Sequence, residues 1–145
     1  MSFEVNILGC GSALLTSLRN QSAQVVQVQN RHFLIDCGEG TQVQIRNHKI
    51  RMQNINHIFI SHLHGDHYFG LPGLLSTFHL LGREKEIHLY GPAELKNLIY
   101  SLLKASNTYL KYDLHFHALN FKNSELLFED KRVEVIRELE EIMNN

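Results

Sequence analysis

Short blocks of apolar residues alternate with polar turns along the chain, and their spacing separates strands from helices. Extended, strand-like blocks occupy 3–8, 24–29, 32–36, 55–60, 86–90, 111–118, 125–128 and 132–136. Helical spacing occupies 41–48, 68–81, 93–105 and, as an amphipathic pattern, 137–143. This order predicts one α/β domain over 1–145 with an amphipathic helical tail over 137–145.

The segment that follows the apolar run 55–60 concentrates side chains that can bind metal ions. It holds His62, His64, Asp66 and His67 within six positions. His62 and His64 point the same way if the backbone is extended, and Gly65 allows the turn that brings the next two side chains to the same cavity. One possible assignment gives His62 and His64 to a first metal ion and Asp66 and His67 to a second. A histidine pair alone is often a solvated strand face, but imidazole and carboxylate together at this spacing indicate zinc ligands.

Composition narrows the class of protein. A chain of 145 residues with 43% hydrophobic and 20% charged residues is ordinary for a globular domain. Its formal net charge of -1 gives no overall attraction to nucleic acid. No apolar stretch approaches a membrane span, and the first residues lack a signal peptide pattern. Cys10 and Cys37 suggest reduced thiols that pack in a cytoplasmic protein.

Three other patterns carry weaker signals. The turn 9–12 resembles a dinucleotide fingerprint, but Leu14 replaces its third glycine, so a cofactor role is disfavoured. Asp36 lies at the end of an apolar strand. Its carboxylate either forms a hydrogen bond with the ring nitrogen of a ligand histidine that does not bind the metal, or it caps a turn. His115 and His117 repeat the histidine spacing without a following acid, which favours a half-exposed strand over a metal site.

Four segments together carry a resemblance to a known family: 9–12 (GCGS), 36–42 (DCGEGTQ), 61–67 (SHLHGDH) and 70–75 (GLPGLL). They resemble the metallo-β-lactamase superfamily and, within it, the ribonuclease Z family, which matures tRNA 3′ ends. The likeness runs from about residue 3 to residue 136. It implies a four-layer αββα sandwich, two zinc ions, a homodimer, precursor tRNA as substrate and a cytoplasmic location.

The resemblance also implies roles for single residues. Asp66 would ligate one zinc ion and orient the attacking water, which makes it the candidate general base for hydrolysis of a phosphodiester. Arg19, Asn20, Arg46 and Lys49 are weaker candidates for contacts with RNA phosphates. Arg46 and Lys49 lie in a local basic segment for which a solvated face is the favoured interpretation.

Two departures from the family change what is expected of this chain. The loop that senses the tRNA 3′ end has the family pattern P-x-K-x-R-N, whereas Leu15 and Ser17 here replace its proline and lysine. Family members are about twice as long, and their later half supplies the remaining ligands; no histidine follows His117 here. The expected fold is therefore only the first half of the sandwich, with one face of its sheet uncovered.

Two ligands per metal ion fall short of the three that catalytic zinc normally keeps, so we expect zinc to bind weakly or at one position. The chain is then a fragment, the product of an internal deletion, or a protein that borrows ligands from a partner. Two alternative functions stay open. One is a hydrolase of small esters or thioesters with the same metal motif, and the other is a non-catalytic truncated dimerisation module.

Overall fold

The computed structural model describes residues 2–11, 14, 16–119, 125–129 and 134–137. Its main element is a six-stranded sheet in the order β1-β2-β3-β4-β5-β6. The strands are β1 (Phe3–Gly9), β2 (Ala23–Val28), β3 (Arg31–Ile35), β4 (Ile55–Phe59), β5 (Ile87–Gly91) and β6 (Leu114–Ala118). The first three pair antiparallel, and β3 to β6 run parallel. Two further strands, β7 (Glu125–Glu129) and β8 (Glu134–Arg137), pair antiparallel with each other.

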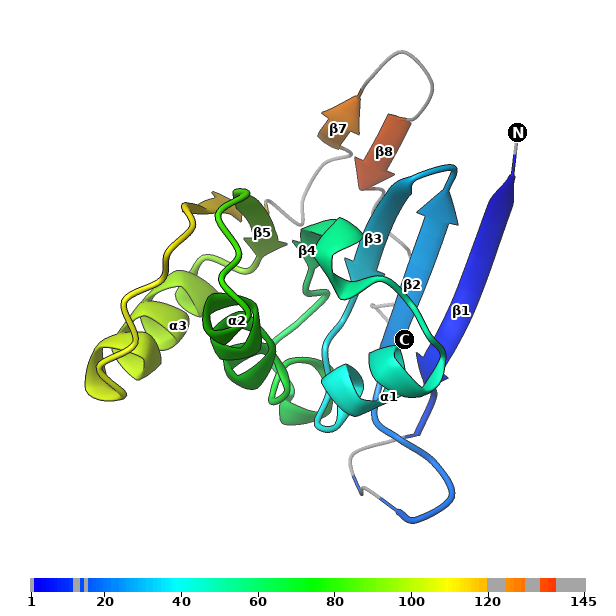
Figure 1. The fold of residues 1–145 in the computed structure, drawn as a ribbon, viewed down its shortest axis with the longest axis horizontal. Helices are drawn as coiled ribbons and strands as arrows, with labels where there is room; N and C mark the ends of the chain where they lie inside the picture. Colours follow the sequence, from blue (N-terminus) through cyan, green and yellow to red (C-terminus); the bar gives the residue numbers. More distant parts are fainter. Residues whose placement is uncertain (1, 12–13, 15, 120–124, 130–133, 138–145) are drawn as a thin grey trace.

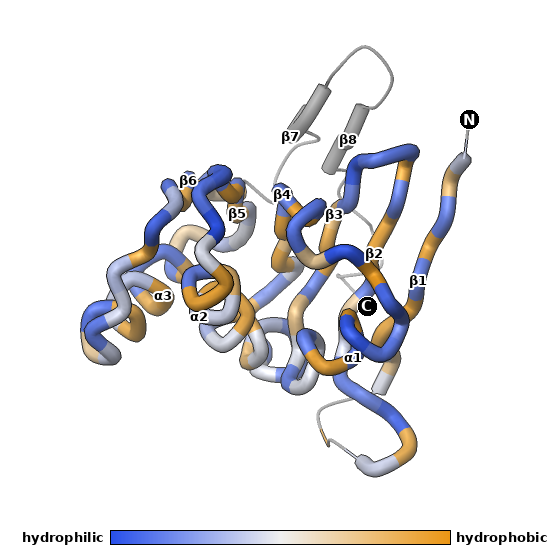
Figure 2. The backbone as a smooth tube through the Cα atoms, viewed as in Figure 1, coloured by the Kyte–Doolittle hydropathy of each residue, from blue (hydrophilic) through white to orange (hydrophobic). Residues whose placement is uncertain are grey.

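Three α-helices accompany the sheet, namely α1 (Thr41–Asn47), α2 (Leu71–Leu80) and α3 (Glu94–Ala105). They lie along one side of it (Figure 1), and hydrophobic and hydrophilic positions alternate along them (Figure 2). Among the helices in the described part of the chain, none is long and apolar enough to cross a membrane. The parallel strands thus receive helical cover on one face.

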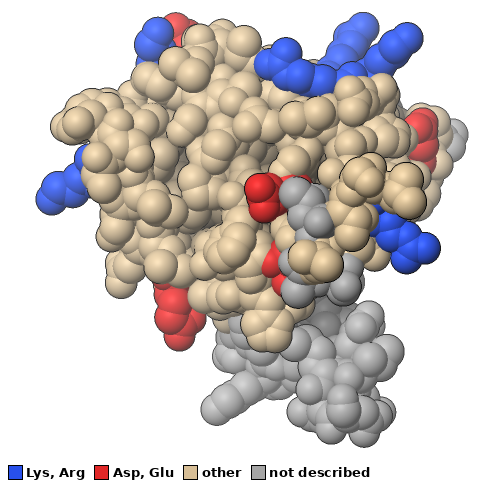
Figure 3. Space-filling model, turned by 90° about the horizontal axis from the view of Figure 1, so that it is seen from below, with Lys and Arg blue, Asp and Glu red and all other residues tan. Residues whose placement is uncertain are grey.

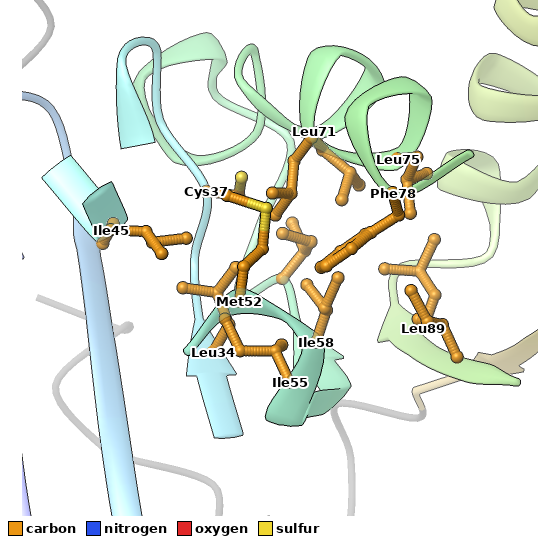
Figure 4. Packing of buried hydrophobic residues seen from close by; sticks show 14 of the residues in the cluster. Leu34, Cys37, Ile45, Met52, Ile55, Ile58, Leu71, Leu75, Phe78 and Leu89 are labelled. Carbon is orange, nitrogen blue, oxygen red and sulfur yellow. The ribbon is translucent and has the colours of Figure 1, made fainter. Parts of the chain in front are cut away.

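The core lies between the helices and one face of the sheet. Leu34, Ile58 and Leu89 stand opposite one another on β3, β4 and β5, and each is at most 1% exposed. Phe78 and Leu75 of α2 close over this row (Figure 4). Burying one such side chain contributes about 1.5–3 kcal/mol. Successive side chains of a strand point to opposite faces of the sheet, so the positions of the apolar residues determine which face packs against the helices.

The opposite face of the sheet changes character from one side to the other. One row of paired positions runs across all six strands and consists of Val5, Val26, Phe33, His57, His88 and His115. The residues of this row are apolar on β1 to β3 and are histidines on β4 to β6. On β1, Phe3, Val5 and Ile7 are 68%, 45% and 50% exposed. An apolar strand this exposed fits the uncovered sheet face expected from the sequence.

The expected elements are present with shifted ends. The helix expected over 68–81 begins only at Leu71, because residues Gly65–His67 form a separate 3-10 turn. Arg137 ends β8 rather than starting a helix, and the rest of the expected tail lies outside the described residues. Both cysteines are free thiols; Cys37 is buried in the core as expected, whereas the packing role expected for Cys10 is wrong because Cys10 is exposed.

Arg83 is a buried cation that holds the loop before β5. It is 4% exposed, and its guanidinium donates to the Lys85 carbonyl at 2.7 Å, the Gln53 carbonyl at 3.2 Å and Asn56 Oδ1 at 2.6 Å. Its guanidinium carbon lies 4.9 Å from the centre of the Phe78 ring. The compact ammonium group of a lysine lacks the planar set of N–H donors with which the guanidinium reaches these acceptors at the same time. We expect Arg83→Lys to lower the free energy of unfolding by about 2 kcal/mol in urea titrations. An unchanged midpoint would show that the network contributes nothing.

His57, His88 and His115 form an imidazole row on β4 to β6, and its first member, His57, should make stability depend on pH. Burial, together with the smaller effect of the neighbouring His88 and His117, lowers its pKa to about 4. The unfolded chain takes up this proton near pH 6.5, so the folded state loses stability as pH falls from about 6.5 towards 4. The titratable groups beside it are Lys85, Glu86, His88, Tyr90 and His117.

We expect His57→Gln to reduce the fall in urea midpoint between pH 7 and pH 5. His48→Gln is the matched control, because His48 is exposed at the end of α1 and should keep the wild-type pH dependence. An equal effect of both substitutions would contradict the assignment to His57.

Candidate metal centre

The four predicted ligands lie on the loop that leaves the carboxyl end of β4. Ile60 still belongs to the sheet, since its N–H donates to the Tyr90 carbonyl at 2.8 Å. The chain then runs to His64 and turns through the 3-10 helix Gly65–His67, closed by a bond of 2.9 Å from His67 N–H to the His64 carbonyl. This turn folds the second pair of ligands back onto the first.

The imidazole rings come together at this turn. The ring centre of His62 lies 3.8 Å from that of His67 and 4.7 Å from that of His64. Asp66 Oδ2 lies 3.3 Å from His67 Nε2. Burial, together with the neighbouring imidazoles, lowers the pKa of His62, which favours the neutral ring that can ligate a metal.

Asp36 is the buried anchor behind these rings. It follows β3 with φ of 60° and is 6% exposed. Its Oδ2 lies 2.7 Å from His67 Nδ1, and its Oδ1 accepts from the Ser61 backbone N–H at 2.8 Å and from Ser61 Oγ at 2.9 Å. Ser22 Oγ donates to Oδ2 at 3.2 Å. A carboxylate can only accept, so His67 carries a proton on Nδ1, and its Nε2 faces Asp66.

Two glycines let the loop after β3 cross the loop before α2 at contact distance. A Cβ on Gly70 would lie 2.1 Å from the Gly38 carbonyl oxygen, and a Cβ on Gly38 would lie 2.5 Å from the Asp66 carbonyl oxygen. The crossing is tied by hydrogen bonds from Gly70 N–H to the Cys37 carbonyl at 2.9 Å and from Cys37 N–H to the His67 carbonyl at 2.7 Å. The glycines of DCGEG and GLPG therefore bring Asp36 to His67.

The donor set fits a metal centre in part. Three imidazoles and one carboxylate converge, and the orientation of His67 leaves Nε2 available. As the side chains stand, no group of three or more His, Cys, Asp or Glu residues within the described ranges is arranged to hold an ion. The four donors are thus brought close but, as they stand, do not enclose a cation.

The residues predicted to contact RNA differ in their exposure. Arg19, Arg46 and Lys49 are exposed, and Asn20 is half-buried with its Oδ1 3.4 Å from the Cβ position of Gly40. Figure 3 shows the molecule from below, with acidic side chains near the middle and Lys and Arg side chains at the periphery.

Sequence reasoning missed Ser61 and Ser22, which both donate to the Asp36 carboxylate. Ser61 directly precedes the first histidine, and its hydroxyl also lies 3.0 Å from His62 Nδ1. A hydroxyl residue next to a ligand run is a usable signal. Ser22 gives no such signal in the sequence, because only the pairing of β2 with β3 brings it near Asp36.

Comparisons with known proteins identify the class first. The chain superposes on human tRNase Z, short form, with a TM-score of 0.79 and 34% identity, covering 91% of this chain and 62% of that chain. YhfI from Bacillus subtilis, a metallo-β-lactamase fold protein, gives a TM-score of 0.62 at 18% identity over 91% of this chain and 56% of that chain. The fold is that of the metallo-β-lactamase superfamily, which confirms the fold expected from the sequence.

The family follows from sequence. The chain belongs to the family described as anti-Pycsar protein Apyc1, whose model matches residues 3–138. Among its curated relatives are proteins named Ribonuclease Z, such as that of Bacteroides thetaiotaomicron, with 47% identity over 92% of this chain. The protein of that name from Porphyromonas gingivalis is 43% identical over 92% of this chain. The chain spans only 42% and 44% of those relatives, so less than half of each is represented.

Proposed function

We propose that this chain provides the first metal ligands of a zinc-dependent endoribonuclease that removes the 3′ trailer of precursor tRNA. The observation that carries the proposal is the convergence of His62, His64, Asp66 and His67 in front of Asp36. Identity of 47% to a Ribonuclease Z over 92% of this chain supports the substrate class. A cytoplasmic location and a homodimer are part of the same proposal.

Each residue of the centre has a distinct task in this proposal. Zinc, when bound, makes water more acidic and neutralises charge on the phosphoryl oxygens. Asp36 holds the Nδ1 proton of His67, which fixes the ring and directs Nε2 to the metal. Asp66, a carboxylate beside that ring, takes the proton of the attacking water as general base. The products are a tRNA with a 3′ hydroxyl and a trailer with a 5′ phosphate.

RNA binding in the proposal uses three exposed side chains and one half-buried side chain. Arg19, Asn20, Arg46 and Lys49 would contact phosphates, which position an RNA without reading its bases. The contacts made by the charged side chains should weaken as the salt concentration rises.

Zinc binding gives the first measurement. With two protein ligands available per ion, we expect the purified 145-residue chain to hold fewer than two zinc ions through dialysis against a chelator. Asp66→Asn should weaken what binding there is, while Asp113→Asn, an exposed aspartate before β6, should not. Two tightly held zinc ions per chain, measured by elemental analysis, would contradict the ligand count.

Cleavage assays test the function itself. Trimming of a precursor tRNA to a 3′ hydroxyl end supports the nuclease, whereas hydrolysis of bis-p-nitrophenyl phosphate or a thioester alone favours a small-molecule hydrolase. A third result, no hydrolysis by a stable dimer in size-exclusion chromatography, favours the non-catalytic module. That alternative is supported by the exposed apolar residues Phe3, Val5 and Ile7 on β1.

A further inference from the structure

The hydroxyl group of Ser61 lies between the buried carboxylate and the first ligand of the metal centre. Its Oγ is 2.9 Å from Asp36 Oδ1, 3.0 Å from Asp36 Oδ2 and 3.0 Å from His62 Nδ1. His67 Nδ1 lies farther from this hydroxyl, at 3.4 Å, and is 2.7 Å from the carboxylate itself. Ser61 therefore connects Asp36 to His62.

The backbone fixes the position of this hydroxyl. The Ser61 N–H donates to Asp36 Oδ1 at 2.8 Å. The preceding residue, Ile60, is buried, and its N–H donates to the Tyr90 carbonyl at 2.8 Å. Asp36 also accepts from Ser22 Oγ at 3.2 Å. Removal of the Ser61 hydroxyl leaves all of these bonds in place, so its role can be tested in a folded protein.

The acceptors around Ser61 Oγ determine the direction of its proton. A hydroxyl has one proton to donate and two lone pairs that accept, whereas a carboxylate only accepts. The Ser61 proton therefore points to Asp36. If it pointed to His62 instead, the Oγ lone pairs would face two carboxylate oxygens at 2.9 Å and 3.0 Å, an electrostatically unfavourable contact. The lone pairs are thus left for His62 Nδ1, which carries a proton to make its bond of 3.0 Å.

A neutral imidazole has one ring proton, so a proton on Nδ1 leaves a lone pair on Nε2, the nitrogen that can then bind a metal ion. We propose that Ser61 is a positioning residue, which relays the charge of Asp36 to His62 and holds this ring with Nε2 free for the metal. One carboxylate then orients a ligand of each pair, His67 by its own bond and His62 through the hydroxyl. The inference rests on the proposed function, since it takes both rings as metal ligands.

The tautomer of His62 can be measured in the metal-free protein by nuclear magnetic resonance. At pH 8, above the usual histidine pKa of about 6.5, correlations between ring nitrogens and ring protons distinguish a proton on Nδ1 from one on Nε2. The signals of His62 are those that disappear in His62→Gln. We expect a proton on Nδ1 in the wild type and a shift of the population towards Nε2–H in Ser61→Ala. Ser61→Thr keeps a hydroxyl and should restore the wild-type signals.

Ser22→Ala is the matched control, because it removes another hydroxyl that donates to Asp36 and leaves Ser61 in place. It should not change the tautomer of His62. Calorimetric titration with zinc gives the second measurement. The zinc affinity of Ser61→Ala should fall about 10-fold, as when a metal ligand loses the partner behind it, and should recover in Ser61→Thr.

Failure of this inference is distinguishable from failure of the proposed function. A chain that binds no zinc or cleaves no RNA would contradict the function, yet His62 would still carry its proton on Nδ1. The relay through Ser61 is wrong if wild-type His62 carries its proton on Nε2, or if Ser61→Ala leaves the tautomer or a measured zinc affinity unchanged. It is equally wrong if Ser22→Ala changes the tautomer as much as Ser61→Ala does.

Discussion

Replacing Asp36 by alanine is expected to remove about 3–5 kcal/mol from the free energy of unfolding. The carboxylate is 6% exposed and is contacted by the Ser61 N–H and Oγ, Ser22 Oγ and His67 Nδ1 at 2.7–3.2 Å. Alanine leaves these groups buried without their common acceptor, and each loses its partner in a place where water enters poorly. Urea titration of both proteins measures the difference.

Asp36→Asn separates the role in metal binding from the role in folding. The amide keeps the size of the side chain and one acceptor oxygen, so the protein should stay folded. It no longer fixes the Nδ1 proton of His67 with a charge, and the affinity for zinc should fall about 10-fold to 100-fold. Asp113→Asn is the control, because Asp113 is exposed before β6. Unchanged zinc affinity in Asp36→Asn would reduce Asp36 to a turn-capping residue.

The strands and helices could be placed from the sequence because each depends on local periodicity. The apolar run 55–60 became β4, and the apolar spacing of 93–105 became α3, which starts one residue later. The start of α2 was misplaced, since Gly65–His67 forms a 3-10 turn and Tyr68, with φ of -146°, is not helical. Strand order and the parallel pairing of β3 to β6 depend on distant contacts, which local periodicity does not encode.

The candidate site was visible to the extent that its residues are adjacent in sequence. His62, His64, Asp66 and His67 lie within six positions and are recognisable as a set. The partners of Asp36 are separated from it by 14 and 25 residues at Ser22 and Ser61, and periodicity says nothing about such pairs.

The imidazole row was hidden for a related reason. His57, His88 and His115 come from three strands, and each alone looks like an ordinary polar position on a strand. Only the register between the strands aligns them.

Gly70→Ala is expected to destabilise the fold by about 3 kcal/mol or more through a steric clash between loops. Gly70 has φ of -83° and ψ of -9°, angles that alanine adopts without strain. The new Cβ would lie 2.1 Å from the Gly38 carbonyl oxygen and 3.2 Å from the Cys37 carbonyl oxygen. These are backbone atoms in a hydrogen-bonded crossing, so relief requires the loop that carries Asp36 to move away from His67. Thermal and urea unfolding measure the loss, and zinc affinity should fall with it.

Gly73→Ala, three residues further along, is the matched control. Its Cβ would meet only the Gln42 side-chain nitrogen at 3.1 Å, and a side chain can yield by the few tenths of an ångström required. Alanine also suits the interior of α2 better than glycine by about 0.5–1 kcal/mol, so Gly73→Ala should lie within about 1 kcal/mol of wild type. Equal stability of Gly70→Ala and Gly73→Ala would mean that the two loops are free to separate. The short distance between Asp36 and His67 would then have to be maintained by the serine hydroxyls alone.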